Sequence, residues 1–422
     1  MKILIINGYI RENNGDAALM SVLAHQLRGV FPDANIVVSG MEDSKEHPDF
    51  EGFRNVGSMR LYVAAEHISK PRRIIRKFLV FGISYVWAYL PFRQVFGKIL
   101  PLGITGELLA INTADVVVSI GGGYIIGQDS FAGNLNILFL TLPIRLAEKL
   151  GKMIVLAPQS FGPFANNWQR RIVLKTLNAA QLVCVREDKS YFLLKNLGVN
   201  ENIMCRTIDS GFAYKSESTR YSEIKSNGMR VGITARNWLK GGLQENYEKG
   251  LANFIVNIQK KYNAEVVLVP QVAVSFQEDD DRIVNERINV LAIKGGARSI
   301  QVMDEIDLPD IKNLYSTFTF TVGTRFHSVI FSLTSLVPAI AIEYEHKTSG
   351  IMHDLNLDEW VIKIEDVTTE RLNVLFDKLV LHREEYVKHL NLVLPPYVQR
   401  TNDVPYLIKR AYERHLVDIR KK

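Results

Sequence analysis

Arg325, His327 and Lys347 in the segment 320–350 could bind or protonate an anion. The pattern FTVGTRFHSVIFSLT predicts a strand that ends near Gly323 and a helix that begins at or near His327. Arg325 would then lie at the carboxyl end of the strand, where open α/β sheets bind ligands. Its guanidinium can hold a carboxylate or a phosphate with two parallel hydrogen bonds. These residues predict one wall of a site for a small, multiply charged anion.

Lys347 and His327 would bring different chemistry to this site. Lys347 follows the next predicted strand, PAIAIEYE, and is expected in the loop after it. The helix dipole disfavours a charged imidazolium at His327, whereas a bound dianion would favour it, so ligand binding could make the histidine an acid. For each residue alone, an ion pair, a helix cap or a buried core histidine is the better explanation. The three together favour a site.

Two glycine-containing segments also follow predicted strands. Gly15 and Asp16 stand between the strand ILII, Ile3 to Ile6, and a helix over AALMSVLAHQLRGVF. Asp16 is predicted to be the N-cap of that helix, whose backbone N–H groups could face an anion. The run 121–123 follows the strand VVVS, where glycines would let the backbone approach a ligand or another loop closely. A tight turn is at least as good an explanation, because the spacing matches neither the dinucleotide fingerprint nor the P-loop.

Strands and helices alternate along most of the chain, which predicts α/β domains of the doubly wound type. The first domain continues through AQLVCVRE, where Arg186 ends a strand. The polar stretch KSESTRYSEIKSNG predicts a linker, and a second domain opens with RVGITARNW, whose strand ends at Arg236. We expect domains at 1–215 and 229–390 with a cleft between them, and a terminal helical segment at 391–422 that packs back on the first domain.

The composition limits the class of ligand and the compartment. The 422 residues are 47% hydrophobic, which is enough for the cores of two or three domains. A net charge of +6 suits an acidic small molecule, a nucleic acid or an anionic membrane, without choosing among them. The two cysteines, Cys184 and Cys205, have the spacing of neither a zinc site nor a disulfide framework, which indicates a reducing compartment. The start, MKILIINGYI, is expected to be a strand and not a signal peptide.

The segment 70–102 does not fit the alternation of strands and helices. Basic residues precede an apolar run from Phe78 to Phe92, which is shorter than the roughly 20 residues that a membrane-spanning helix needs. The basic start, with Tyr85, Trp87 and Tyr89 in the apolar run, is typical of a helix that lies in the interface of an anionic membrane. A buried helix with a solvated basic start explains the segment equally well.

Several motifs together resemble the polysaccharide pyruvyltransferase family, particularly its colanic-acid-type exopolysaccharide members. They are NNGDAAL, SIGGGYI, APQSFGPF, VREDKS and, above all, TVGTRFHSVIFSLTSLVPAIAIEYEHKTSGIM. The resemblance extends from Met1 to about Leu357 and is weakest across 70–102, the linker and the tail. It implies a fold similar to the glycosyltransferase B architecture, with two Rossmann-like domains facing across a cleft.

The resemblance also implies a reaction. A pyruvyl group would pass from phosphoenolpyruvate to two hydroxyls of a sugar, leaving a pyruvate ketal and inorganic phosphate. Arg186 and Arg325 would bind the donor, Lys347 and Arg236 would assist, and His327 would be the general acid. The cleft residues nearest the acceptor sugar would be Asp16, Gly15, Gly121, Gly122 and Gly123. Arg186 belongs to the other domain, so its contact with the donor would require domain closure.

Two other readings remain open. A nucleotide-sugar-dependent glycosyltransferase or epimerase would use the same architecture, and a non-catalytic membrane module would use 70–92 as its anchor. Neither accounts for Arg325, His327 and Lys347 together. We expect phosphoenolpyruvate and a sugar acceptor, lipid-linked or free, as ligands, with no cofactor, no metal and no nucleic acid. The expected location is the cytoplasm, with peripheral contact at the inner face of the membrane.

Overall fold

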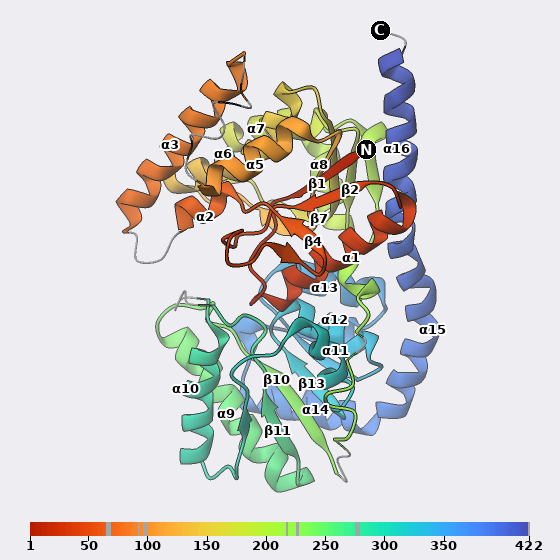
Figure 1. Ribbon diagram of the computed structural model, residues 1–422. Coiled ribbons are helices and arrows are strands. Elements are labelled where there is room, and N and C mark those ends of the chain that lie inside the picture. Colours follow the sequence, from red (N-terminus) through yellow and green to blue (C-terminus); the bar gives the residue numbers. More distant parts are fainter. Residues whose placement is uncertain are drawn as a thin grey trace. The chain divides into compact units, whose positions relative to one another are not determined.

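The computed structural model describes residues 1–64, 69–91, 93, 95, 100, 102–216, 218–224, 228–274 and 279–420 (Figure 1). Internal contacts divide the chain into two compact units. Unit 1 comprises Met1–Ile10, Leu19–Ser210 and Gln399–Lys422, and unit 2 comprises Arg11–Ala18 and Gly211–Val398. Phe92 of the predicted apolar run, residues 217 and 225–227 of the predicted linker, and 421–422 lie outside the described residues.

Unit 1 is built on one sheet. Its strands are β1 (Lys2–Ile6), β2 (Asn35–Val38), β3 (Asp49–Phe50), β4 (Phe53–Asn55), β5 (Val116–Ser119), β6 (Gly122–Ile125), β7 (Met153–Phe161), β8 (Leu182–Val185) and β9 (Met204–Arg206). The strand order is β3-β4-β2-β1-β5-β7-β8-β9, and β6 pairs with β7. The described pairings are parallel except that of β3 with β4. This is the doubly wound α/β sheet that the sequence predicted.

Helices cover both faces of this sheet. They are α1 (Asn14–Val30), α2 (Met59–Ala64), α3 (Lys70–Tyr89), α5 (Leu102–Thr113), α6 (Phe131–Lys149), α7 (Asn167–Asn178), α8 (Asp188–Leu197), the 3₁₀ helix η1 (Glu201–Ile203) and α16 (Val404–Arg420). Successive side chains of a strand point to opposite faces. On one face Leu4, Val117 and Ile154 share a single apolar core with side chains of α5, α6 and α7. On the other face α16 contacts β7 and β8.

Unit 2 repeats the design with a wholly parallel sheet. Its strands are β10 (Arg230–Thr234), β11 (Glu265–Leu268), β12 (Gln301–Val302), β13 (Phe320–Gly323), β14 (Ala339–Glu343) and β15 (Val361–Lys363). Its helices are η2 (Ser210–Ala213), α9 (Gly242–Tyr262), α10 (Asp281–Lys294), α11 (Leu308–Tyr315), α12 (Phe326–Thr334), α13 (His346–Asp354), η3 (Asp358–Trp360), η4 (Ile364–Asp366), α14 (Thr369–Leu381) and α15 (Arg383–Asn402). The order is β12-β11-β10-β13-β14-β15, so the winding reverses direction at β10, between β11 and β13.

The start of α1 belongs to unit 2 by its contacts. The backbone N–H of Asn14 donates to the carbonyl of Gln271 at 3.1 Å, and that of Ala273 donates to the carbonyl of Glu12 at 3.0 Å. Asn13 pairs with Val272 as an isolated antiparallel bridge. The contact units therefore differ from the predicted ranges 1–215 and 229–390 by assigning Arg11–Ala18 to unit 2 and the end of the chain to unit 1.

Two local predictions were wrong. Asp16 is not the N-cap of α1, because the helix begins at Asn14 and the Asn13 side chain accepts from the Asp16 backbone N–H at 3.3 Å. Asn13 also donates to the Asp16 carboxylate at 2.9 Å, so the two side chains close the first turn reciprocally. Lys347 lies in the first turn of α13 and not in the preceding loop. The predicted N-cap lies three residues after Asn13, which precedes the helix, and Lys347 is the second residue of α13; several polar residues before a helix leave its start uncertain in the sequence.

Candidate functional site

Three neighbouring strands of unit 2 end at the positions where the sequence predicted an anion site. β10, β13 and β14 lie side by side, and Arg236, Arg325 and Tyr344 each follow one of them within two residues. Because the winding reverses at β10, this is the switch point of the sheet, where parallel α/β folds bind ligands. We call the group at this edge the strand-end cluster; it consists of Arg236, Asp279, Asp281, Arg325, His327, Tyr344 and Lys347.

Two carboxylates hold the guanidinium of Arg325. Its Nε and Nη2 donate to the Asp281 carboxylate at 2.6 to 3.0 Å, and Nη2 also donates to the Asp279 carboxylate at 2.8 Å. Asp281 is only 1% exposed and accepts backbone N–H bonds from Gln271 and Val272, which fix its position. The bidentate contact that the sequence predicted with a ligand is therefore made with Asp281. A ligand would contact Arg325 from the side of its Nη1.

The charge of Arg325 is secured by the same partners. Burial alone would lower the pKa of the guanidinium, but the carboxylates of Asp281 and Asp279 outweigh burial and raise the pKa above its ordinary value. Because Arg325 is already held in place by its carboxylate partners, little free energy is needed to reorient it when an anion binds.

Hydroxyl groups connect β10 to the turn that carries Arg325. The Thr234 Oγ1 accepts the backbone N–H of Thr324 at 3.0 Å and that of Arg325 at 3.3 Å, and it lies 2.9 Å from the Ser328 Oγ. The Thr324 hydroxyl lies 2.7 Å from the Tyr247 hydroxyl. These contacts are buried, so the turn between β13 and α12 is held from within the core.

His327 is the second residue of α12, as the sequence predicted. It is packed closely against Gly15 in the first turn of α1: a Cβ at Gly15 would lie 2.0 Å from the His327 Nδ1. Only glycine allows this approach of backbone to imidazole. The structure therefore brings together Gly15 and His327, which the sequence analysis had assigned to different domains.

Helix N-termini converge around His327. Gly15 lies in the first turn of α1, His327 in that of α12, and Lys347 in that of α13. The Lys347 Nζ lies 5.5 Å from the centre of the Phe326 ring, which places the starts of α12 and α13 beside each other. Each N-terminus carries partial positive charge and unsatisfied N–H groups, so their convergence favours an anion.

Arg236 packs against two aromatic rings that also pack against each other. Its guanidinium carbon lies 4.5 Å from the ring centre of Tyr344 and 4.7 Å from that of Trp238, and the two rings are 4.8 Å apart. The Arg236 Nη2 also donates to Asp279 at 3.3 Å. Asp279 therefore links Arg236 to Arg325, which come from the ends of adjacent strands.

Tyr344 lies among cations and was missed by the sequence analysis. Burial would raise the pKa of its phenol, but Lys347 and Arg236, and to a lesser degree Arg325, outweigh burial and lower the pKa below the ordinary value of 10. Lys347 lies 5.3 Å from the centre of the ring. A tyrosine directly after a strand, between two acidic residues in EYE, gave no sequence signal of this environment.

The cations of the strand-end cluster are matched by carboxylates. Arg325 pairs with Asp281 and Asp279, Arg236 with Asp279, and Lys347 with Glu345 at 2.7 Å. A bound dianion would therefore have to compete for Arg236 and Lys347 with Asp279 and Glu345, which are 33% and 23% exposed. Asp279 and Asp281 come from the acidic run QEDDD, which the sequence analysis did not single out.

Arg186 belongs to unit 1 and is 1% exposed. Its Nε donates to the Ser160 hydroxyl at 2.7 Å, and its Nη1 pairs with Asp209, which is fully buried. The structure brings Arg236, Arg325, His327 and Lys347 together in unit 2, whereas joint contact of Arg186 with the same ligand stays a prediction.

The glycine run of unit 1 is explained locally. A Cβ at Gly121 would lie 2.3 Å from the Pro158 carbonyl oxygen, and Gly122 has a φ of 128°. Gly122 and Gly123 begin β6, which pairs with β7. The tight turn is thus sufficient to account for Gly121 and Gly122, and contact of the run with an acceptor stays a prediction.

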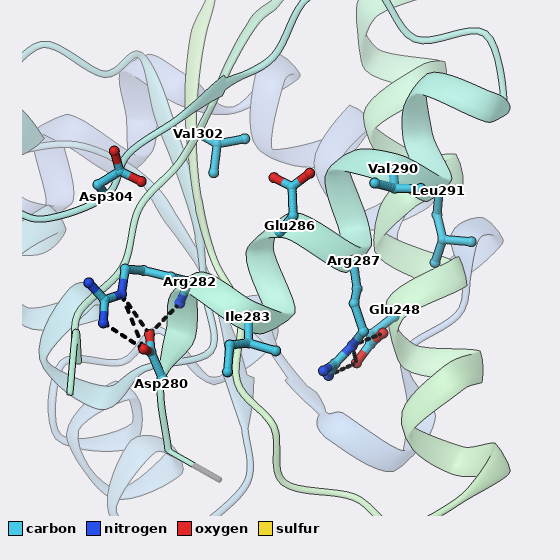
Figure 2. A pocket seen from close by; sticks show the side chains of 10 residues that line it. All are labelled: Glu248, Asp280, Arg282, Ile283, Glu286, Arg287, Val290, Leu291, Val302 and Asp304. Carbon is cyan, nitrogen blue, oxygen red and sulfur yellow. Dashed lines mark hydrogen bonds and ion pairs between the residues drawn. The ribbon is translucent and has the colours of Figure 1, made fainter. Parts of the chain in front are cut away.

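A large open pocket lies elsewhere in unit 2 and contains none of the predicted site residues (Figure 2). It has a volume of about 790 Å³ and is lined by side chains of α9, α10 and β12 and their flanks. Its arginines are already paired, Arg282 with Asp280 at 2.7 Å and Arg287 with Glu248 at 2.9 Å, as Figure 2 shows. The pocket therefore adds no side chain to the predicted anion site, and the strand-end cluster stays the candidate because it contains the predicted residues. The described residues also contain no group of three or more His, Cys, Asp and Glu side chains that could hold a metal ion.

The fold is that of glycosyltransferase B enzymes and sugar-nucleotide epimerases. The chain is similar to a putative UDP-N-acetylglucosamine 2-epimerase from Listeria monocytogenes, with a TM-score of 0.62, 14% identity and coverage of 99% of this chain and 97% of that one. The UDP-GlcNAc 2-epimerase from Neisseria meningitidis is similar with a TM-score of 0.60 and 14% identity, over 98% of this chain and 100% of that one. A glycosyltransferase from Rickettsia africae is similar with a TM-score of 0.55 and 11% identity, over 98% of each chain. At such identities the likeness concerns the fold alone.

The sequence identifies the family. The model of the polysaccharide pyruvyl transferase family matches residues 13–346, so the chain belongs to that family. It is also 22% identical, over 391 residues, to the amylovoran biosynthesis protein AmsJ of Erwinia amylovora, covering 87% of this chain and 89% of that protein. The resemblance inferred from the motifs is confirmed.

Proposed function

We propose that the protein transfers a pyruvyl group from phosphoenolpyruvate to two hydroxyls of a sugar, in an exopolysaccharide or in its lipid-linked precursor. Membership of the pyruvyl transferase family supports pyruvyl transfer in general. The observation that carries the donor assignment is the gathering of Arg236, Arg325 and Lys347 around His327 at the switch point of unit 2. Phosphoenolpyruvate carries a carboxylate and a phosphate, and fixed cations and helix N-termini suit both groups.

The donor would bind by exchanging ion pairs. Arg325 would keep its ion pair with Asp281 and donate to the ligand from Nη1. Lys347 would exchange its ion pair with Glu345 for one with the phosphate. Arg236 is oriented by Trp238 and Tyr344, so its guanidinium is pre-positioned beside the same strand ends. Since the cations are already neutralised in the free protein, their carboxylate partners must turn outward or take up protons on binding. This predicts donor binding that weakens as salt concentration rises.

His327 would serve as the general acid and then as the general base. A proton from the imidazolium adds to the methylene carbon of the donor, which leaves a cationic centre at the central carbon. The first sugar hydroxyl attacks that carbon and returns a proton to the imidazole. Phosphate then leaves with the electron pair of its bond to carbon, and the second hydroxyl closes the ketal and gives its proton to the phosphate. The bound dianion stabilises the imidazolium needed for the first step, against the dipole of α12.

The acceptor would reach this centre from the side of the cleft residues. Gly15 and Asp16 lie in the first turn of α1, and Gly15 touches His327, so this turn would form the wall nearest the reacting carbon. The Gly121 to Gly123 run and Arg186 would contribute from unit 1 after closure. We propose that the reaction takes place in the cytoplasm, where a lipid-linked acceptor would be presented at the inner face of the membrane.

Calorimetric titration with phosphoenolpyruvate tests the donor assignment. We expect binding by the wild-type protein, loss of at least about tenfold in affinity for Arg325→Ala, because a charged partner of the donor is removed, and no change for Arg371→Ala. Arg371 is an exposed arginine of α14 and serves as the matched control. Competing nucleotide sugars form the second arm. Binding of nucleotide sugars without binding of phosphoenolpyruvate would contradict pyruvyl transfer and support a glycosyltransferase or an epimerase.

A further inference from the structure

The helix α3 exposes an apolar face to solvent. Five large hydrophobic side chains are about half exposed or more: Ile75 at 58%, Phe78 at 53%, Leu79 at 48%, Val86 at 63% and Tyr89 at 67%. Their spacings of three, four and seven residues place them on one side of the helix, over a length of about 21 Å. Single exposed hydrophobic residues are common, whereas a contiguous row of this length marks an interaction surface.

The opposite side of α3 anchors the helix in unit 1. Val80, Ser84, Trp87 and Ala88 are buried, and three of them belong to the apolar core. The Trp87 Nε1 donates to the carbonyl of Arg93 at 2.7 Å. One face of the helix is therefore part of the core, whereas the other face is apolar and exposed, and contact with a membrane stays a prediction.

The exposed face continues onto α6. Phe131, which begins α6, is 65% exposed, and its ring lies 6.3 Å from that of Phe78. At the other end of α6 the Lys149 Nζ lies 4.0 Å from the centre of the Tyr89 ring. Two helices of unit 1 thus contribute to one surface, which we call the α3 face; it consists of Ile75, Phe78, Leu79, Val86, Tyr89 and Phe131. In Figure 1 α3 is the orange helix on the side of unit 1 away from α16.

Basic residues border the α3 face at both ends. Arg72 is exposed in the first turn of α3, and Lys149 of α6 is exposed beside Tyr89, whereas the Arg76 Nη1 donates to the Tyr62 carbonyl at 2.7 Å. The side chains of α3 include no carboxylate. The combination of an apolar row, aromatic rings at its edges and a cationic border is the pattern of a helix that lies in the interface of an anionic bilayer. The long basic side chains can reach the headgroups while the apolar row enters the acyl boundary.

We propose that unit 1 docks on an anionic lipid bilayer through the α3 face, with α3 lying in the plane of the interface. Charge complementarity selects this partner, because the apolar row alone would suit many surfaces but the cationic border fits negatively charged headgroups. No helix in the described part of the chain combines the length and hydropathy that crossing a bilayer requires. The contact is therefore peripheral. It goes beyond the proposed transfer reaction and does not depend on it, because no donor or sugar takes part.

Cosedimentation with vesicles tests the proposal on the full-length protein. The probes are vesicles of phosphatidylcholine alone and of phosphatidylcholine with a third of phosphatidylglycerol. We expect at least about tenfold stronger binding to the anionic vesicles, decreasing as salt rises, because several basic residues face the headgroups. Binding to neither kind of vesicle would overturn the proposal, and equal binding to both would overturn the role of the cationic border.

Variants distinguish vesicle binding through the α3 face from nonspecific binding through other exposed hydrophobic residues. We expect the double variant Phe78→Ser with Tyr89→Ser to lose at least about tenfold in vesicle binding, since two of its aromatic contacts are removed. The matched control is Val374→Ser with Leu381→Ser on α14, at 71% and 80% exposure. Arg72→Glu should weaken binding more than Arg414→Glu, an exposed arginine of α16. Equal loss in test and control variants would contradict the proposal.

Two further measurements keep the outcome clear. Circular dichroism and thermal unfolding should match the wild type for every variant, because all substituted side chains are exposed. Light scattering coupled to gel filtration reports the oligomeric state without lipid. A different result is an oligomeric wild type and a monomeric Phe78→Ser with Tyr89→Ser variant, with no vesicle binding by either. This result would assign the α3 face to a second copy of the chain and overturn the bilayer as its partner.

Discussion

At the residue scale, the strand-end cluster depends on contacts made by small and acidic residues. Arg325 is held by Asp281 and Asp279 before any ligand arrives, and His327 is confined by the backbone at Gly15. An arginine with a buried carboxylate partner is oriented but not free to turn. The site is thus organised by residues that do not themselves carry the proposed chemistry.

Substitution of Gly15 tests the packing around His327. Gly15→Ala places a methyl group 2.0 Å from the His327 Nδ1, so either the imidazole or the first turn of α1 must move. We expect a loss of about 1–3 kcal/mol in unfolding free energy, measured in urea, and a large loss of activity. Gly29→Ala in the same helix is the control; a Cβ there meets nothing within 4 Å, and it should stabilise the protein by up to about 1 kcal/mol. Full activity of Gly15→Ala would contradict the close packing.

Titration of Tyr344 tests the electrostatics of the cluster. Its lowered pKa predicts that Tyr344 ionises at a lower pH than ordinary tyrosines. In an alkaline titration followed by ultraviolet difference spectra, Tyr344 should therefore give a first phase of tyrosinate formation, which Tyr344→Phe should remove. Because the folded-state pKa is depressed, the stabilisation by the phenolate is present above the ordinary pKa of 10 and is lost as pH falls through the lowered pKa. The stability difference between wild type and variant should therefore grow toward high pH. An unchanged early phase in Tyr344→Phe would assign it to another tyrosine.

At the element scale, the connection between β10 and the β13–α12 turn positions both Arg325 and His327. Thr234 on β10 accepts the two backbone N–H groups that begin this turn. The threonine is buried, and its hydroxyl supplements the backbone bond from the Thr324 N–H to the Thr234 carbonyl, the last one between β10 and this turn. The two elements thus set the position of the predicted acid relative to the predicted anion-binding arginine.

Thr234→Val tests this connection. The substitution keeps the shape of the side chain and removes the hydroxyl that accepts the buried Arg325 N–H, whereas the Thr324 N–H keeps the Thr234 carbonyl at 3.2 Å. We expect a loss of about 1–3 kcal/mol in unfolding free energy and weaker phosphoenolpyruvate binding by calorimetry. Thr234→Ser keeps the hydroxyl and should retain most of the donor affinity. Equal affinity in Thr234→Val and wild type would show that the hydroxyl does not position the donor site.

At the scale of the whole molecule, the two units carry different predicted residues. Arg236, Arg325, His327 and Lys347 lie in unit 2, and Arg186 lies in unit 1. We predict that a donor contacted by both units binds with domain closure, as in other two-domain enzymes that close on substrate.

Domain closure is tested by small-angle scattering. Saturation with phosphoenolpyruvate should lower the radius of gyration of the wild-type protein. Because Arg186 is buried beside Asp209, Arg186→Ala alone would leave a buried carboxylate unpaired, so the double variant Arg186→Met with Asp209→Asn is preferred. This variant should bind the donor in unit 2 with reduced affinity and without compaction. Unchanged affinity and compaction would remove Arg186 from the donor site.

The sequence alone was sufficient for the order of elements, the α/β class and the family. Apolar strands ending in polar loops and helices with regular apolar spacing are local properties. So were the position of Arg325 after a strand, that of His327 at the start of a helix, and the basic start and apolar run of the segment that became α3. The motif around Arg325 is long enough to identify the family without coordinates.

Only the tertiary structure decided which side chains surround the predicted ones. Asp281 meets Arg325, and Gly15 meets His327, across long separations in sequence that carry no periodic signal. Tyr344 gained its environment because three strand ends meet at one edge of a sheet. The sequence also could not tell whether α3 is core or surface, since hydropathy records the amount of apolar surface on a helix, whereas its partners are determined by packing against the rest of the chain.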